Sequence, residues 1–153
     1  GGTGTGKTHL LEGLVSASRM NHPERNCVYL TAEQFTTQFL EALHGRGLPM
    51  FRRKYRSVDL LVIDDVQFLA GKRATLTEFL HTLDTLQRER RQVVITSDRA
   101  PHELQELGQA LSTRVAGGMT ARLDAPDFPT RVGITRQFAR KHELNLTDDI
   151  VEL

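Results

Sequence analysis

The sequence predicts an α/β protein in which helices flank a parallel sheet. Short continuous apolar runs at 60–63 (LLVI) and 93–97 (VVITS) are typical of strands buried on both faces. Stretches with apolar residues at helical spacing alternate with these runs, and strand–helix–strand order implies parallel pairing through right-handed crossovers. With 153 residues, 39% of them hydrophobic and 25% charged, the chain has the composition of one soluble globular domain.

The first eight residues, GGTGTGKT, match the GxxxxGK[ST] pattern of a Walker A motif, or P-loop, at every position. In such a loop the glycines turn backbone N–H groups toward the α- and β-phosphates, the lysine reaches the β- and γ-phosphate oxygens, and the Thr hydroxyl ligates Mg²⁺. An amphipathic run follows, so the N-terminus of a helix adds its positive dipole end to the same anion site. This context favours a P-loop over a glycine-rich turn with an incidental lysine. The residues expected to bind the nucleotide are Gly1, Gly2, Thr3, Gly4, Thr5, Gly6, Lys7, Thr8 and His9.

A buried parallel strand normally precedes a P-loop, and nothing precedes Gly1. We therefore expect the chain to begin within a domain, with the first strand of the sheet absent. A helix is predicted over 7–20 and a strand over 27–30. Thr31 is predicted to cap the next helix, with Gln34 completing a capping box.

The remaining elements are predicted from apolar periodicity and from Gly, Pro and N-cap signals. In chain order they are a basic helix over 50–56, a strand over 60–63, a helix over 76–86, a strand over 93–97, a helix over 104–115, a weaker strand over 120–123 and a helix over 128–142. Thr147 is expected to cap one more helix, which the sequence truncates at Leu153.

Two acidic residues follow the buried strand 60–63, at the strand end where open α/β sheets place their ligands. This is the Walker B arrangement, in which Asp64 holds Mg²⁺ and Asp65 orients or deprotonates the attacking water. Two acids can also simply end a strand and begin a turn, but the P-loop upstream favours the Walker B interpretation. Asp98 ends the strand 93–97, where it lies beside the γ-phosphate or caps the next helix. The spacing alone supports both interpretations of Asp98 equally.

The overall charge of +1 indicates no basic excess, although local clusters can bind nucleic acid. One such cluster is Arg52, Arg53, Lys54 and Arg56, which forms either a solvated helix face or a DNA-binding surface. Phe51 and Tyr55 interleave with it, and core packing is favoured over base stacking for both. Cys27 is interpreted as a core thiol rather than a nucleophile. The histidines show no metal-ligand spacing, and no apolar run approaches the length of a membrane span.

Four stretches strongly resemble one family, the bacterial chromosomal replication initiators (DnaA). They are the P-loop with residues 9–11 (HLL), residues 55–68 (YRSVDLLVIDDVQF), residues 95–99 (ITSDR) and residues 111–114 (LSTR). The resemblance covers nearly the whole chain. It implies a P-loop NTPase of the AAA+ type, with the nucleotide-binding core over 1–142 and the start of a small helical lid over 143–153.

The resemblance also implies residue roles. Asp98 is similar to the sensor 1 position, and Arg114 resembles the arginine finger that reaches the ATP of a neighbouring protomer, so that Asp65, Asp98 and Arg114 form the catalytic set. Thr8 and Asp64 are implied to hold Mg²⁺. Residues 33–55 look like the insertion that helps such initiators build a filament and line a path for single-stranded DNA.

The function implied is an ATP-dependent initiator of chromosomal replication. Binding of Mg-ATP would drive oligomerisation on origin DNA and strand opening, and slow hydrolysis to ADP would reset the protein. The implied partners are origin duplex DNA through a domain outside this chain, single-stranded DNA through the AAA+ core, further copies of the protein, and a replicative helicase or its loader. The implied compartment is the cytoplasm.

The sequence departs from the family pattern at two places. Ala110 stands where many members have an arginine four residues before the finger, and Ala74 stands where an arginine often follows the Walker B strand, although Lys72 matches. Two alternatives stay open: a helicase-loader or transposition-helper AAA+ ATPase, and a nucleotide-binding module that assembles without hydrolysing ATP.

Overall fold

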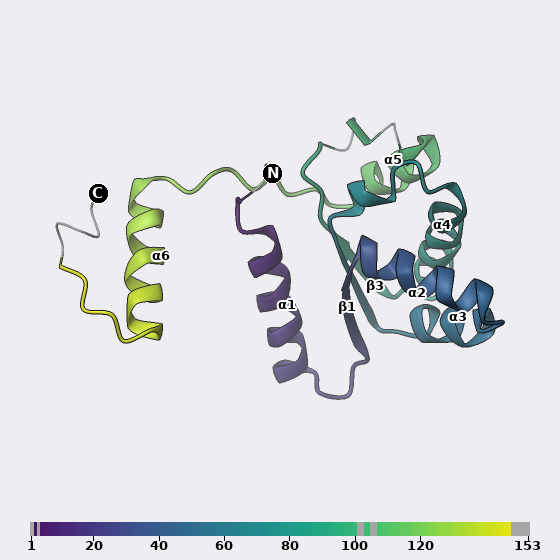
Figure 1. The fold of residues 1–153 in the computed structure, drawn as a ribbon, viewed down its shortest axis with the longest axis horizontal. Coiled ribbons are helices and arrows are strands. Elements are labelled where there is room, and N and C mark those ends of the chain that lie inside the picture. Colours follow the sequence, from purple (N-terminus) through teal and green to yellow (C-terminus); the bar gives the residue numbers. More distant parts are fainter. Residues whose placement is uncertain (1, 3, 101–102, 105–106, 148–153) are drawn as a thin grey trace. The chain divides into compact units, whose positions relative to one another are not determined.

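The computed structural model describes residues 2, 4–100, 103, 104 and 107–147. Packing divides the chain into two units, Gly1–Leu123 and Asp124–Leu153. The first unit holds the sheet and the helices around it (Figure 1). The second unit contains α6 (Phe128–Lys141), whose first turn is capped by Asp127 through a 3.0 Å hydrogen bond from the Thr130 N–H.

The first unit is built on a sheet of three parallel strands in the order β1-β2-β3: β1 (Cys27–Thr31), β2 (Leu60–Asp64) and β3 (Gln92–Ile95). Ile63 of β2 is in register with Leu30 on one side and with Ile95 on the other. All five residues of the central strand β2 are buried. The predicted parallel sheet is therefore confirmed for these three strands.

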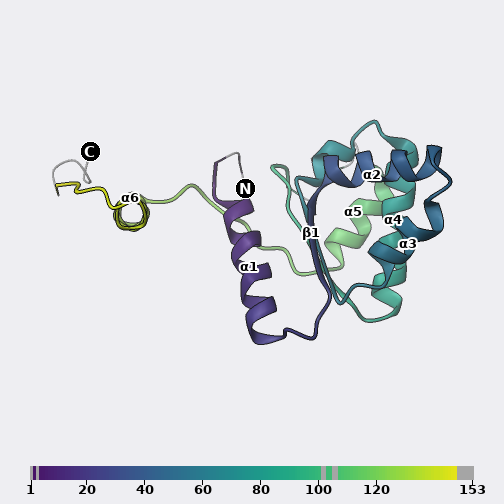
Figure 2. The ribbon, with the colours of Figure 1, turned by 60° about the horizontal axis from the view of Figure 1, so that its bottom comes forward.

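Helices cover both faces of this sheet, and Figures 1 and 2 show α1 (Lys7–Asn21) on one face and α2 (Ala32–His44), α3 (Leu48–Arg56) and α4 (Arg73–Arg88) on the other. Successive side chains of a strand point to opposite faces, so β2 contributes to both cores. Leu61 and Ile63 belong to the larger core under α2 to α4, whereas Leu60 and Val62 pack with α1.

Aromatic side chains fill the larger core where α2, α3 and α4 meet. The Phe35 ring lies 5.2 Å from that of Phe51, 5.3 Å from that of Tyr55 and 5.5 Å from that of Phe79, centroid to centroid. Phe51 and Tyr55 are 5% and 1% exposed, which confirms that both are core residues. The predicted capping box is also confirmed, because Thr31 and Gln34 exchange hydrogen bonds of 3.1 and 2.9 Å.

Two predicted elements are wrong in part or in whole. The helix expected over 104–115 is α5 (Gln109–Ala116), because Gly108 has φ 85°, which no right-handed helix accommodates. Residues 120–123 form no strand, since four residues with weak apolar patterning become a strand only when a neighbouring strand accepts their hydrogen bonds. A short 3₁₀ helix, η1 (Val66–Leu69), follows β2. The helix expected after Thr147 lies outside the described residues. Among the helices that the structure does describe, none is long and apolar enough to cross a membrane.

Candidate active site

The glycine-rich loop has the backbone geometry of a phosphate cradle. Gly4 and Gly6 have φ of 76° and 85°, and nothing lies within 4 Å of a Cβ added at either. The loop is closed by two hydrogen bonds to the Gly2 carbonyl, from the Lys7 ammonium at 2.7 Å and from the Thr5 hydroxyl at 3.0 Å. Open space above a left-handed turn at a helix N-terminus suits a bound phosphate. Gly1 and Thr3 lie outside the described residues, and the nucleotide role of His9, which is exposed in the first turn of α1, stays a prediction.

Asp64 lies at the end of β2 and is 2% exposed. Three hydroxyl groups donate to its carboxylate. Thr8 and Tyr29 donate to Oδ2 at 2.7 and 3.2 Å, and Thr96 donates to Oδ1. The structure thus brings together the two predicted metal ligands, Thr8 and Asp64, from positions 56 residues apart.

Two oxygen ligands beside a phosphate cradle fit Mg²⁺, which is usually held by one or two carboxylates together with substrate phosphates and water. Among the residues the structure describes, no group of three His, Cys, Asp or Glu side chains could hold a metal ion instead. A magnesium ion at Thr8 and Asp64 would therefore complete its shell with phosphate oxygens and water.

Asp65 and Asp98 are linked by one side chain, that of Gln67. The Gln67 amide nitrogen donates to Asp65 Oδ1 at 2.9 Å, and its oxygen accepts the Asp98 N–H at 3.4 Å. The Asp65 N–H donates to the Thr96 hydroxyl at 3.0 Å, so Asp64 and Asp65 both contact Thr96, the residue that follows β3. Asp98 does not cap α5, which begins eleven residues later at Gln109.

Tyr29 is the least expected member of this group. Burial, reinforced by the negative charge of Asp64, raises the pKa of Tyr29 to about 12. Its hydroxyl is therefore protonated at neutral pH and donates to the carboxylate.

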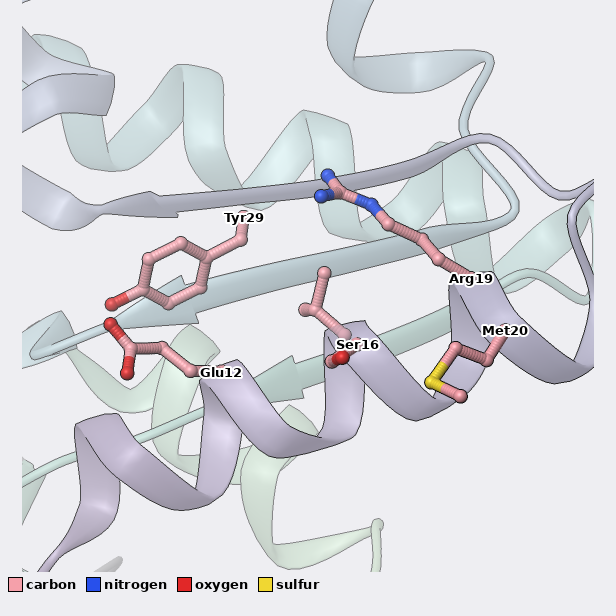
Figure 3. Close-up of a pocket in the computed structure, with 6 residues that line it drawn as sticks. Glu12, Ser16, Arg19, Met20 and Tyr29 are labelled. Carbon is pink, nitrogen blue, oxygen red and sulfur yellow. The ribbon is translucent and has the colours of Figure 1, made fainter. Parts of the chain in front are cut away.

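Beside Tyr29 an open pocket of about 470 Å³ lies between α1 and β1, lined also by Glu12, Val15, Ser16, Arg19 and Met20 (Figure 3). None of the predicted site residues lines this pocket.

Arg114, the predicted finger, is bound to a carboxylate of its own chain. Its Nε and Nη2 donate to the two oxygens of Asp84 on α4 at 2.7 and 2.9 Å, and Nη1 donates to the Ala110 carbonyl at 2.8 Å. The hydrogen bond from Arg114 holds the pKa of Asp84 below its ordinary value. Both side chains remain about a third exposed, at 32% and 40%, so this is a pair at the surface.

The basic cluster on α3 is also partly engaged within the chain. Arg52 and Arg56 both pair with Glu78 of α4, which is 4% exposed. Lys54 donates to the Gln38 side chain at 2.8 Å. Two of the four predicted basic residues therefore hold α3 against α4 rather than forming only a solvated face.

Five residues that contact the predicted site or basic residues were not predicted from the sequence: Tyr29, Gln67, Thr96, Glu78 and Asp84. One of them had a readable signal: Glu78 falls on the buried stripe of its helix, and a carboxylate there needs a cationic partner. Nothing in the periodicity indicates the others, because their roles depend on which side chains meet across neighbouring strands and helices.

A phosphate cradle at a helix N-terminus, joined to a buried acid on the central strand of a parallel sheet, defines a P-loop nucleotide-binding protein. Residues 1–122 match the bacterial DnaA ATPase domain. The chain belongs to this family.

Curated relatives agree with this assignment. The chain is 41% identical over 149 residues to the chromosomal replication initiator protein DnaA of Enterococcus faecalis, and 40% identical to that of Lacticaseibacillus casei. Each match covers 97% of this chain and 33% of the relative. The chain thus spans about a third of the length of these curated relatives.

Solved structures give the same fold. Domain III of the Thermotoga maritima replication initiation protein DnaA matches with a TM-score of 0.95 and 38% identity, over 99% of this chain and 64% of that one. A replication initiator DnaA bound to AMPPCP and single-stranded DNA matches with a TM-score of 0.88 and 34% identity, over 99% of this chain and 47% of that one. The AAA+ fold class predicted from the sequence is confirmed.

Proposed function

We propose that this protein is an ATP-dependent initiator of chromosomal DNA replication, acting in the cytoplasm as a nucleotide switch. The observation that carries the nucleotide part is the 2.7 Å hydrogen bond between Thr8 and Asp64, which unites the P-loop with the Walker B acid. Family membership and the AMPPCP bound to a similar DnaA support ATP and ADP as the ligands. A magnesium ion held by Thr8 and Asp64 would neutralise charge on the β- and γ-phosphate oxygens.

Hydrolysis is assigned to the residues after β2 and β3. Asp65 orients the attacking water and accepts its proton, and Asp98 detects whether the γ-phosphate is present. Asp65 is one methylene shorter than the glutamate of many AAA+ enzymes, and one of its oxygens already accepts a hydrogen bond from Gln67. The shorter side chain reaches less far toward the water, and the contact with Gln67 occupies one carboxylate oxygen; both features support slow turnover.

Assembly is assigned to Arg114. In an ATP-bound oligomer its guanidinium would leave Asp84 and dock on the γ-phosphate held by a neighbouring protomer. Exchange of one anionic partner for another couples ATP binding to the contact between protomers. Because Ala110 replaces an arginine common in the family, Arg114 would provide this contact without that second cation.

The proposed DNA contacts divide between two parts of the protein. Origin duplex would bind through a domain outside this chain, and single-stranded DNA through the AAA+ core, a proposal supported by the similar DnaA structure that holds single-stranded DNA. Since Glu78 engages Arg52 and Arg56, we assign the single-strand contact first to Lys72 and Arg73 at the start of α4. A replicative helicase or its loader is the proposed protein partner, and the boundary of the lid at residue 143 also stays a proposal.

The test is the solution mass of the intact protein by light scattering, in Mg-ATP and in Mg-ADP at one protein concentration. We expect large assemblies with ATP alone, lost in Arg114→Ala. Asp84→Asn is the matched control, because it removes the intramolecular partner and leaves the finger. It should assemble at an ATP concentration no higher than the unmodified protein requires.

Equal masses in both nucleotides would contradict the switch and favour a helicase-loader or transposition-helper ATPase. If Arg114→Ala still assembles only with ATP, the proposed nucleotide switch is supported, but the proposed role of Arg114 in assembly is wrong.

A further inference from the structure

We infer that Tyr29 is a positioning residue for the metal-binding carboxylate of Asp64, acting through its phenol hydroxyl. This inference rests on the proposed function, since it assumes that Asp64 serves a magnesium ion. It adds a residue from β1, a strand that neither the P-loop nor the Walker B pattern includes.

Strand register brings the two side chains to the same face of the sheet. Tyr29 pairs with Val62, and Asp64 lies two residues further along β2. Side chains two apart on a strand share a face, about 6.6 Å apart along a parallel strand, a distance that a tyrosine ring pointing along the strand spans. Val62 packs in the core with Leu11 and Val15 of α1, so this face is the one covered by the helix that carries Thr8.

The three hydroxyl groups donate to different oxygens of the Asp64 carboxylate. Thr96 donates to Oδ1, whereas Thr8 and Tyr29 donate to Oδ2. Thr8 is also the proposed ligand of the magnesium ion, so its position depends on the presence of the metal. Tyr29 is then the donor to Oδ2 that keeps its place whether or not the metal is bound, and it fixes the orientation of the carboxylate before the metal arrives.

Packing alone does not explain the hydroxyl. The Tyr29 ring lies against the small core formed by Leu11, Val15, Cys27, Leu60 and Val62, and a phenylalanine ring would fill that space equally well. The hydroxyl points instead toward carboxylates: it donates to Asp64 Oδ2, and Figure 3 shows the Glu12 side chain directed toward it. Partners that orient a metal ligand in this way typically change metal affinity when they are removed.

The experiment compares two substitutions that each remove one phenol hydroxyl. Tyr29→Phe deletes the donor to Asp64, and Tyr55→Phe deletes the hydroxyl of the other tyrosine, which donates to Gln38 in the larger core. Binding of ATP to the intact protein is measured by calorimetry over a series of Mg²⁺ concentrations and again in EDTA. In Tyr29→Phe the Mg²⁺ concentration that gives half of the magnesium-dependent gain in ATP affinity should rise about 10-fold. The affinity for metal-free ATP should not change.

Tyr55→Phe should leave both quantities unchanged. An unaltered Mg²⁺ midpoint in Tyr29→Phe would overturn the inference, and so would an equal loss of affinity with and without Mg²⁺, which indicates a packing defect. Asp64→Asn distinguishes the metal site itself from the role of Tyr29. If this variant retains the normal Mg²⁺ dependence, the metal site of the proposed function fails; if it loses that dependence while Tyr29→Phe keeps it, only the inference about Tyr29 fails.

Discussion

Asp65 combines a proposed catalytic role with a left-handed backbone, at φ 57° and ψ 55°. Asp and Asn occupy this region several times more often than other non-glycine residues, because their short polar side chains can hydrogen-bond locally. The Thr96 hydroxyl accepts the Asp65 N–H and so helps to hold this conformation. The position therefore selects for a short side chain as well as for a carboxylate.

Replacing Asp65 separates these two requirements. Asp65→Asn keeps the length and the backbone preference but not the base, so it should bind ATP normally and hydrolyse it at least about 100-fold more slowly. Asp65→Glu keeps the base, so its hydrolysis should be no slower, but it should lower the free energy of unfolding by about 1 kcal/mol because glutamate is less suited to this backbone. Phosphate release and chemical denaturation measure the two effects. Hydrolysis at the normal rate in Asp65→Asn would remove Asp65 from the chemistry.

At single residues, a motif predicts which side chains lie together, and their roles stay predictions. Thr8 and Asp64 were predicted as metal ligands, and the structure places their oxygens 2.7 Å apart. Tyr29 and Gln67 were not predicted, because a tyrosine in a half-buried strand and a glutamine after an acid are common. Their contacts exist only once β1 and β3 lie on either side of β2.

Among the elements, α3 and α4 are joined by the buried carboxylate of Glu78, which pairs with Arg52 and Arg56. Burial alone would raise the pKa of Glu78, but the hydrogen bond from Arg52 and the charges of Arg56 and Arg52 outweigh it, so the pKa lies below its ordinary value. A carboxylate with a lower pKa in the folded state stabilises the fold above its unfolded pKa, near 4.5, and this contribution is lost as the pH falls through the folded value. Acid should therefore loosen α3 from α4.

Glu78→Gln tests this contact. At pH 7 it should lower the free energy of unfolding by about 1–3 kcal/mol, because two arginines lose their charged acceptor but can still turn toward water. The difference from the unmodified protein should begin to shrink below about pH 4.5, where Glu78 becomes protonated in the unfolded state, and it should vanish as the pH falls through the lower pKa of the folded state. Denaturation curves at several pH values measure both effects. Glu89→Gln, at an exposed position just after the same helix, is the control, and equal losses in the two variants would contradict a specific role for Glu78.

Elements with a strong local signal were predicted well. The buried run of β2 and the capping box at Thr31 carry their own evidence in the sequence, and the structure confirms both. The start of α5 was placed too early because apolar spacing continued through Leu104 and Leu107, both of which are buried without belonging to that helix. The strand at 120–123 was wrong because a strand is defined by its neighbour, which periodicity does not reveal.

For the whole molecule, nucleotide binding should increase the free energy of unfolding. A ligand that binds only the folded state at 100 times its Kd stabilises it by about 2.7 kcal/mol. Saturating Mg-ATP should therefore raise the Tm by several degrees, and Lys7→Ala should abolish this shift because the ammonium is the proposed contact to the β- and γ-phosphates. Lys141→Ala, in the second unit, is the matched control and should keep it. An ATP-induced shift that persists in Lys7→Ala would place the nucleotide elsewhere.

Helix α4 begins at the residues assigned to single-stranded DNA, Lys72 and Arg73, and also carries Asp84, the partner of Arg114. Glu78 and Asp84 stand six residues apart on α4, about 9 Å along its axis, and they hold respectively the basic helix α3 and the proposed finger, Arg114. If Arg114 exchanged Asp84 for a neighbour's phosphate, as proposed, α4 would lose the cation that is hydrogen-bonded to this carboxylate in its C-terminal half, where a negative charge is unfavourable. Such a helix can transmit cooperativity in both directions: if protomer docking tightens the grip on DNA, bound DNA must promote docking by the same free energy.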